Sequence, residues 1–352
     1  MLEESRPLGI GLIGAGMVGQ RAHLANFVNI PSCRVVALAE LRPDLGRDAA
    51  LKYGVERIYP SHRELLADRE VKAVVVVTRR PALGPIVLSA LEAGKHVLSE
   101  KPMAHSIAQA ERLLQAAQSS GTVFSVGYMK RHDAGVQEGK RWFERLRGSG
   151  ELGAFLGARF FSFGGRFADG SDDYVMTPEQ RPEGLELWPI APDWLPGALH
   201  DDYAWFLNVF CHSLNLLRFF FDATPELRWV DFAARNGRVA VFRINEAPVV
   251  LEMAEIEDPG WREGVEIRFE RGCLAIDLPA PLSGLPARVR LERADARHRD
   301  DPEIVPSWAF RRQAEAFVRD VREGRTPLAS GADAIEDLRL AEAMWQRHVK
   351  AL

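Results

Sequence analysis

Three glycines near the amino terminus have the spacing of a phosphate-binding turn. Gly14, Gly16 and Gly19 form a GxGxxG run that follows the apolar segment 8–13 and opens a helical pattern over 17–28. In a strand, turn and helix context, this run holds the pyrophosphate of a dinucleotide against the amides and positive dipole of the helix end. An ordinary glycine-rich turn is the alternative. The cofactor contacts expected in this turn are Gly14, Gly16, Met17, Val18 and Gly19.

An acidic residue completes this pattern at the end of the next expected strand, 33–40. Glu40 lies about twenty residues beyond Gly19, where a carboxylate accepts hydrogen bonds from the adenosine ribose hydroxyls. The 2′-phosphate of NADP would meet a like charge there, so Glu40 favours NAD over NADP. Arg42 partly compensates this charge, and a solvated acid at a strand end is the alternative.

A lysine follows another expected strand, 95–100, in the sequence Glu100-Lys101-Pro102. Its ammonium can donate to a substrate oxygen, stabilise developing alkoxide charge and help move the proton that accompanies hydride transfer. The proline permits a cis peptide bond. Because this tripeptide is also common in turns, the interpretation depends on its place beside the expected nicotinamide site.

A histidine on an apolar helix is the second candidate for proton transfer. Over 203–221, Asn208, His212 and Asn215 stand at i, i+4 and i+7, so one helix face carries three polar groups. Buried polar groups need partners, so this face is expected to line a cavity. His212 can exchange a hydroxyl proton near neutral pH, and a core histidine bonded to a carbonyl is the alternative.

Alternating strands and helices must position the residues of the first half. Apolar strand patterns and capped helices follow one another through residue 128, which predicts an α/β Rossmann domain with a doubly wound parallel sheet. Ligands bind such sheets beyond the carboxyl ends of the strands. Besides the glycine turn and Glu40, the residues expected at this edge are Thr78, Arg79, Glu100, Lys101 and Tyr128.

The second half of the chain begins with a long irregular segment, 164–203, rich in Gly, Pro, Asp and Trp. Loops of this length inside a protein are usually functional. Four aromatic residues in or just after it either stack on a sugar ring or fill small local cores: Trp188, Trp194, Tyr203 and Trp205.

Short alternating segments over 227–291 predict a C-terminal α+β domain with an open, mainly antiparallel sheet. We expect a nucleotide-binding domain at 1–127, with the C-terminal helix 332–350 packing back on it. Residues 128–331 then form the domain for substrate binding and oligomerisation.

Composition excludes several classes of partner. The chain has 352 residues, is 47% hydrophobic and 27% charged, and carries a net charge of −4, so nothing favours nucleic-acid or membrane-surface binding. No apolar run resembles a signal core or a membrane span, and a cytoplasmic protein is expected. The three cysteines fit neither a disulfide framework nor a metal cluster, and no metal site is expected at His200-Asp201-Asp202.

Together these residues resemble the glucose–fructose oxidoreductase, inositol dehydrogenase and MocA (Gfo/Idh/MocA) family. The resemblance runs through the whole chain, in GAGMVG, GKHVLSEKPMA, GYMKRHD, the helix with Asn208 and His212, and GRTPLASGADAIEDLRLAEA. It implies NAD(P)-dependent oxidation or reduction of a secondary carbinol on a sugar, cyclitol or derivative. It also implies a homodimer or homotetramer associated through the open sheet.

The resemblance assigns roles to individual residues. Lys101 matches the family's lysine near substrate and nicotinamide, and His212 matches its general acid/base. Arg131 matches the basic residue that often follows the sixth strand. The substrate-binding residues expected on this basis are Lys101, Tyr128, Arg131, Asn208 and His212.

Two departures from the family pattern bear on the chemistry. The family helix usually has Asp where this chain has Asn208 and Asn215, so no carboxylate raises the proton affinity of His212 and proton transfer leans more on Lys101. In place of the commoner Thr-Pro-Asn, the chain has Thr78-Arg79-Arg80, whose two arginines either bind a phosphate or carboxylate or lie in solvent.

The sequence therefore predicts an NAD-dependent dehydrogenase of a polyhydroxylated ring. One alternative is a ketoreductase or dehydrogenase of a nucleotide-linked sugar or glycoside in natural-product biosynthesis. Another is a glycosidase that keeps its NAD and works by transient oxidation and elimination. A third is a non-catalytic NAD-binding regulator on the same fold.

Overall fold

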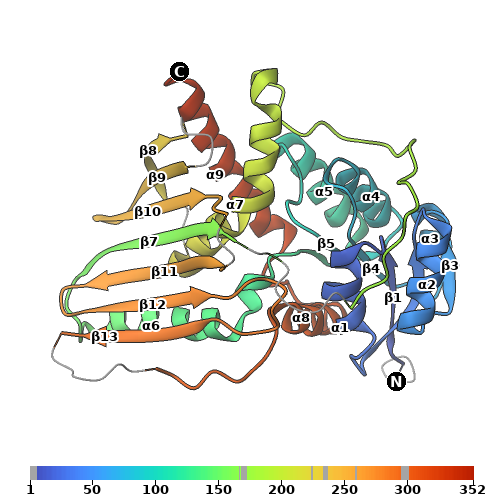
Figure 1. The fold of residues 1–352 in the computed structure, drawn as a ribbon, viewed down its shortest axis with the longest axis horizontal. Helices are drawn as coiled ribbons and strands as arrows, with labels where there is room; N and C mark the ends of the chain where they lie inside the picture. The colour runs from blue at the N-terminus through green and yellow to red at the C-terminus, as the bar shows by residue number, and fades with distance from the viewer. Residues whose placement is uncertain are drawn as a thin grey trace. The chain divides into compact units, whose positions relative to one another are not determined.

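The computed structural model describes residues 6–165, 167, 173–222, 225–232, 237–257, 260–294 and 301–352. The chain divides into two units, each with its own sheet (Figure 1). Unit 1 combines Met1–Tyr128, Ser171–Asn208 and Phe310–Leu338, and unit 2 combines Met129–Gly170, Val209–Ala309 and Arg339–Leu352.

Unit 1 is built on a six-stranded sheet in the order β3-β2-β1-β4-β5-β6. Every strand pair in it is parallel. The central strands are fully apolar because both of their faces are covered, as in β4, where all residues are buried. The predicted doubly wound parallel sheet is confirmed. Its strands are β1 (Leu8–Ile13), β2 (Cys33–Ala39), β3 (Arg57–Tyr59), β4 (Ala73–Val76), β5 (His96–Ser99) and β6 (Phe124–Val126).

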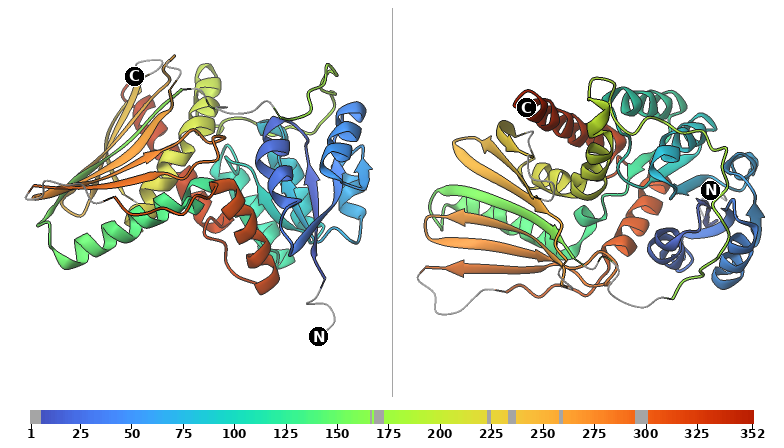
Figure 2. Two further views of the ribbon diagram at one scale, coloured as in Figure 1. Left: turned by 60° about the horizontal axis from the view of Figure 1, so that its bottom comes forward. Right: turned by 45° about the horizontal axis from the view of Figure 1, so that its top comes forward.

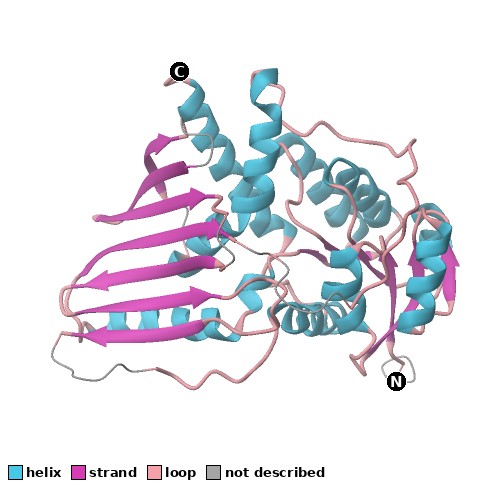
Figure 3. Cartoon of the chain, viewed as in Figure 1, coloured by secondary structure: helices cyan, strands magenta, loops and turns pink. Residues whose placement is uncertain are grey.

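Helices cover both faces of this sheet (Figure 3). On one face, Ile10 and Leu12 share a core with Phe27 and with Phe317 of α8. On the other face, Gly11 lies against Leu65 of α3, α3 adjoins α4, and α4 adjoins α5. The helical elements of unit 1 are the π-helical turn η1 (Gly19–Leu24), α1 (Ala25–Phe27), α2 (Pro43–Tyr53), α3 (His62–Ala67), α4 (Arg80–Glu92), α5 (Ile107–Ser120) and α8 (Ala309–Glu323).

Local caps mark the ends of several helices of unit 1. Ser61 accepts a hydrogen bond from the Glu64 amide at the start of α3, and Ser106 does the same for Gln109 at the start of α5, each at 3.3 Å. Gly54 ends α2 in the left-handed conformation that glycine adopts without strain. These local signals fix where each helix begins and ends, and thus which residues stand at the strand ends.

Unit 2 is built on a seven-stranded sheet in the order β13-β12-β11-β7-β10-β9-β8. Five of its pairs are antiparallel, and β7 with β10 is parallel. The predicted mainly antiparallel sheet is therefore confirmed. Its strands are β7 (Phe155–Gly164), β8 (Glu226–Asp231), β9 (Gly237–Ile244), β10 (Ala247–Ala254), β11 (Arg262–Phe269), β12 (Gly272–Leu278) and β13 (Arg288–Arg293).

Three helices pack on one face of this sheet: α6 (Ala134–Ser149), α7 (His200–Phe221) and α9 (Gly331–Val349). Aromatic contacts fix α6 and α7 there, between Phe143 of α6 and Phe269, and between Phe220 of α7 and Phe160. Figure 2 shows the sheet with these helices on one side, and the described part of the chain places no helix on the other. The 3-10 turns η2 (Met129–His132) and η3 (Gly197–Leu199) complete the elements.

The irregular segment expected at 164–203 has no strand or α-helix from 173 to 196, and α7 begins at His200, earlier than the expected Tyr203. Residues 166 and 168–172 of this segment lie outside the described residues, as do 233–236 and 258–259 of the expected sheet region 227–291. None of the helices in the described residues is long and apolar enough to cross a membrane.

Candidate functional site

The glycine turn has the geometry that its spacing predicts. Gly14 has a φ of 100°, and a Cβ at Gly19 would lie 2.2 Å from the Gly14 carbonyl oxygen, so the helix can approach β1 only without a side chain there. A Cβ at Gly16 would meet nothing within 4 Å. The turn therefore needs two glycines for its own packing and leaves open space at the third, with Met17 and Val18 opening the helix that follows.

Glu40 lies at the end of β2 with 7% of its surface exposed. Its carboxylate accepts hydrogen bonds from the Ala15 amide at 2.8 Å and from Arg42 Nε at 2.8 Å. The acid is thus tied to the backbone of the glycine turn, and Arg42 neutralises part of its charge. This arrangement puts both charges beside the segment expected to hold the pyrophosphate.

A buried histidine that the sequence analysis did not single out links the glycine turn to the end of β5. His23 is 2% exposed, and its Nε2 lies 2.8 Å from Glu100 Oε1. It stands on η1, a π-helical turn, a rare form that is frequent at functional sites. Burial raises the pKa of the Glu100 carboxyl, but the hydrogen bond and charge of His23 and the charge of Lys101 outweigh it, and the net pKa is lowered.

Lys101 directly follows Glu100 at this strand end, and the Lys101-Pro102 bond is cis. The Lys101 amide donates to Glu100 Oε2 at 3.2 Å. Its Nζ donates to the Asn208 carbonyl oxygen at 2.7 Å and approaches Asn208 Oδ1 at 3.4 Å. Unit 1 therefore brings together two of the predicted substrate-binding residues, with the lysine held by both oxygens of Asn208.

Three other predicted residues occupy the same edge of the unit 1 sheet. Thr78 follows β4, and its hydroxyl donates to the Arg79 carbonyl at 3.4 Å. Arg79 is exposed and precedes the first residue of α4. Tyr128 follows β6 and is buried.

Unit 2 holds the remaining predicted residues. Arg131, on η2, donates to the Asn215 carbonyl oxygen at 3.2 Å and lies over the Phe219 ring at 5.4 Å. His212 is buried on α7, the helix that carries Asn208 one turn earlier in unit 1. In the same unit, buried Lys130 forms an ion pair with Glu263, which fixes η2 to β11.

Residues 173–199 of the irregular segment lie along the carboxyl edge of the unit 1 sheet. Gln20 on η1 exchanges hydrogen bonds with the backbone of Val175, at 2.9 and 2.7 Å. The Glu179 carboxylate accepts from the Asp44 and Leu45 amides at the start of α2. Since these contacts lie beside the glycine turn and Glu40, the segment borders the predicted cofactor site.

The aromatic residues of this region divide between the two expected roles. Trp188 is buried against Gly84, where a Cβ would lie 2.2 Å from the indole, and Tyr203 is fully buried. Both fill local cores. Trp194 and Trp205 remain partly exposed.

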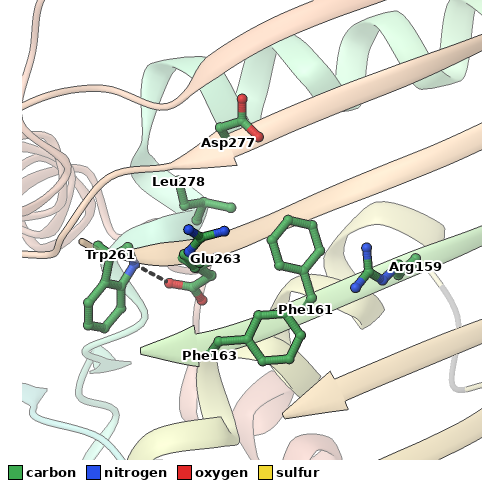
Figure 4. A pocket seen from close by; sticks show the side chains of 8 residues that line it. Arg159, Phe161, Phe163, Trp261, Glu263, Asp277 and Leu278 are labelled. Carbon is green, nitrogen blue, oxygen red and sulfur yellow. Dashed lines mark hydrogen bonds between the residues drawn. The ribbon is translucent and has the colours of Figure 1, made fainter. Parts of the chain in front are cut away.

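Unit 2 has a pocket of about 410 Å³, and none of its lining residues is a predicted site residue (Figure 4). Its charged groups already have partners: Arg159 binds Glu252, and Glu263 accepts from Trp261 at 3.1 Å. We therefore do not place the substrate's reacting carbon there. The lining residues are Arg159, Phe161, Phe163, Trp261, Arg262, Glu263, Asp277 and Leu278.

Within the described residues, no group of three or more His, Cys, Asp and Glu side chains is arranged to hold a metal ion. His200, Asp201 and Asp202 form the first turn of α7, and His200 Nε2 bonds the Leu195 carbonyl at 2.9 Å.

Comparison with known families decides the class of protein. Residues 8–128 match the oxidoreductase family with an NAD-binding Rossmann fold that is named after glucose–fructose oxidoreductase, inositol dehydrogenase and MocA. Over these residues, the chain matches the Gfo/Idh/MocA family. The predicted resemblance is confirmed.

Curated members of this Gfo/Idh/MocA family align with part of the chain. It is 37% identical over 152 residues to inositol 2-dehydrogenase of Burkholderia lata, covering 42% of this chain and 44% of that protein. It is 36% identical over 138 residues to inositol 2-dehydrogenase/D-chiro-inositol 3-dehydrogenase of Shouchella clausii, covering 39% and 40%. The match thus spans less than half the length of these relatives.

Solved structures resemble the whole fold at low identity. A 3-ketoreductase from Actinomadura kijaniata, in complex with NADP and TDP-benzene, has a TM-score of 0.76 at 21% identity, covering 97% of this chain and 98% of that one. A levoglucosan dehydrogenase in complex with NADH and levoglucosan has a TM-score of 0.75 at 19% identity, covering 98% of both. These likenesses establish the two-part fold.

Proposed function

We propose that the chain is an NAD-dependent dehydrogenase that transfers a hydride between nicotinamide and a secondary carbinol of a sugar, cyclitol or sugar derivative. The observation that carries the proposal is the 2.7 Å hydrogen bond from Lys101 Nζ to the Asn208 carbonyl, at the end of β5 in the sheet that bears the glycine turn. The inositol dehydrogenases that align with part of the chain support this substrate class.

The residues present fit a bound dinucleotide. The open space at Gly16 admits a pyrophosphate against the backbone, and the amides at the start of the following helix supply donors. The residues that would hold the cofactor are Gly14, Gly16, Met17, Val18, Gly19, Glu40, Thr78, Arg79, Glu100 and Lys101. When bound, the nicotinamide takes up or gives back the hydride of the substrate carbon.

Lys101 is proposed to orient and polarise the substrate oxygen. An ammonium has three donors, and Asn208 supplies the acceptors that fix it. The remaining donor capacity can stabilise negative charge as it develops on the oxygen. Because Asn208 is neutral, it fixes the lysine without quenching its charge as a carboxylate would.

His212 is proposed to exchange the proton of the reacting hydroxyl. It follows Asn208 by one turn of α7. No acid stands at position 208 or 215 to raise its proton affinity, so we assign part of the proton transfer to Lys101. Arg131 and Tyr128 are proposed to bind other substrate hydroxyls.

Glu40 supports NAD as the preferred cofactor, because its buried carboxylate would repel a 2′-phosphate. Association into a homodimer or homotetramer through the uncovered face of the unit 2 sheet, a cytoplasmic location and a domain boundary at residue 127 stay predictions.

The test is to incubate the purified protein with NAD and a panel of inositols, hexoses, uronates, glycosides and nucleotide sugars, and to follow absorbance of NADH. We expect turnover of at least one member, lost in Lys101→Met. Product without net NADH, from protein that retains NAD on purification, would indicate redox-elimination glycosidase activity. Cofactor binding without any turnover would indicate a regulator and contradict the proposal.

A further inference from the structure

Arg80, the first residue of α4, is a partly buried cation that has no acidic partner among the described residues. Its Nη1 donates to the Ala204 carbonyl oxygen at 3.3 Å, and its guanidinium lies 6.0 Å from the centre of the Trp205 ring. Burial lowers the pKa of this guanidinium, and no carboxylate offsets the effect. A charge removed from water without a counter-ion is costly unless a ligand supplies one.

His105 adds a second incompletely satisfied group near this charge. It is 3% exposed, and its Nε2 has no hydrogen-bond partner among the described residues. Burial, assisted by the charge of Arg80, lowers the pKa of His105 to about 4. The imidazole is therefore neutral near pH 7, and the positive charge of this cluster belongs to Arg80.

Arg80 and Lys101 both donate hydrogen bonds to backbone carbonyls of α7. Lys101 binds the carbonyl of Asn208, and Arg80 binds the carbonyl of Ala204, one turn earlier. Four residues of α-helix rise about 6 Å, so the two carbonyls that receive the cations are separated by roughly that distance. This matches the span between a ring hydroxyl and a substituent elsewhere on the same sugar ring.

Trp205 supplies an apolar surface beside Arg80. Its side chain is 37% exposed and follows Ala204 directly on α7. An indole face can pack on the C–H face of a sugar ring, while an arginine binds a carboxylate or phosphate through two parallel hydrogen bonds.

We propose that Arg80 and Trp205 form a subsite for an anionic substituent, a carboxylate or a phosphate, on the ring whose reacting oxygen binds Lys101. This inference rests on the proposed dehydrogenase function and narrows its substrate to sugar acids or sugar phosphates. It also assigns different roles to the paired arginines, because Arg79 is exposed whereas Arg80 faces α7.

The experiment compares a hexose, its uronate and its phosphate, by calorimetric binding in the presence of NAD and by kcat/KM. We expect the kcat/KM of the wild type to be about tenfold to a hundredfold higher for one charged ring than for the neutral hexose. This is the effect of a charge-assisted hydrogen bond. Arg80→Gln should abolish this preference and leave the neutral hexose unchanged. Arg80→Lys should restore it in part.

The matched control is Arg112→Gln. Like Arg80, Arg112 lies over a tryptophan, 4.8 Å from the ring of Trp188 in the irregular segment, but Arg112 is exposed. This variant should keep the wild-type preference. Circular dichroism and thermal unfolding establish that each variant is folded.

The outcomes separate this subsite from the proposed activity. Preferential binding of an anion that requires Arg80, without turnover of any ring, would support the subsite and contradict the dehydrogenase. Equal kcat/KM for charged and neutral rings would overturn the subsite and leave the dehydrogenase standing. The subsite would also be overturned if Arg80→Gln kept the preference for the charged ring, or if this variant weakened only the binding of NAD.

Discussion

The imidazole of His23 and the carboxylate of Glu100 form a 2.8 Å hydrogen bond between elements 77 residues apart in the chain. His23 lies on the helical turn that begins at Gly19, and Glu100 precedes Lys101 at the end of β5. Glu100 in turn accepts a hydrogen bond from the Lys101 amide. This contact connects the proposed pyrophosphate-binding turn with the proposed reacting lysine.

Removing His23 leaves the Glu100 carboxylate buried without its strongest partner. We expect His23→Ala to lower the free energy of unfolding by about 1.5–3 kcal/mol, the range for a hydrogen bond to a charged group. His23→Gln retains a donor and should recover part of the loss. Urea unfolding at pH 7 measures both.

The pH dependence of the unfolding free energy of the same variants tests whether the charge of Glu100 causes the loss. His23 holds the pKa of Glu100 below its ordinary value of 4.5, so the stabilisation is present above that pH and is lost as pH falls through the lowered pKa. The unfolding free energies of wild type and His23→Ala should therefore converge in acid. Parallel curves throughout would show that the contact contributes only packing.

Alanine substitutions at two glycines of the GxGxxG run should have different effects. A Cβ at Gly19 meets a backbone oxygen at 2.2 Å, so Gly19→Ala should reduce the unfolding free energy by about 1–3 kcal/mol or more. A Cβ at Gly16 meets nothing within 4 Å, so Gly16→Ala should stay within about 0.5 kcal/mol of wild type. Its defect should instead be weaker NAD binding by about tenfold, measured by calorimetry. Unchanged NAD affinity in Gly16→Ala would argue against this turn as the pyrophosphate site.

The fold of the first half was predictable because its signals are local. The β4 residues are all apolar and three of the four are β-branched valines, and Ser61 and Ser106 mark helix starts within three residues of their partners. The π-helical turn at Gly19–Leu24 was not predicted, because a pattern of buried positions over so few residues does not distinguish it from an α-helix.

Glu40 and Arg42 should set cofactor preference in opposite directions. Glu40→Gln retains an acceptor for the Ala15 amide but removes the charge that repels a 2′-phosphate. We expect the kcat/KM ratio of NADP to NAD to rise by at least about tenfold, or ~1.4 kcal/mol. Arg42→Gln should lower that ratio. Ratios that do not move in either variant would place the adenosine ribose elsewhere.

His105 should make the protein less stable in acid. Its pKa is lowered from 6.5 to about 4 by burial, so the unfolded chain binds a proton that the folded chain excludes as pH falls between these values. The difference between the two pKa values corresponds to an unfolding free energy of the order of 3 kcal/mol. This contribution is present above pH 6.5 and is lost toward pH 4. We expect His105→Gln to lose correspondingly less stability between pH 7 and pH 4.

The half-buried His62 is the control for this prediction. Burial also lowers its pKa, but its side chain keeps part of its contact with water. His62→Gln should change the pH profile less than His105→Gln does. Equal effects would show that burial of His105 is not the cause.

The candidate site was predictable only where a charged residue directly follows or ends a predicted strand. Glu40 and Lys101 met that condition. His23 did not, because its partner is distant in sequence, although a histidine one turn after the fingerprint was a usable signal. Residues 173–199 form an irregular segment, and no periodic pattern in the sequence specifies its path along the sheet edge. The contact of Lys101 with Asn208 depends on that path, so it was not predictable either.

The central claim is that hydride passes between the ring carbon and nicotinamide beside Lys101. The most direct measurement uses a ring deuterated at the reacting carbon and mass spectrometry of the nicotinamide formed. We expect one deuterium in the reduced cofactor for each ketone produced, with the transfer lost in Lys101→Met. A product that appears without deuterium in the cofactor, or at the same rate in Lys101→Met, would contradict it.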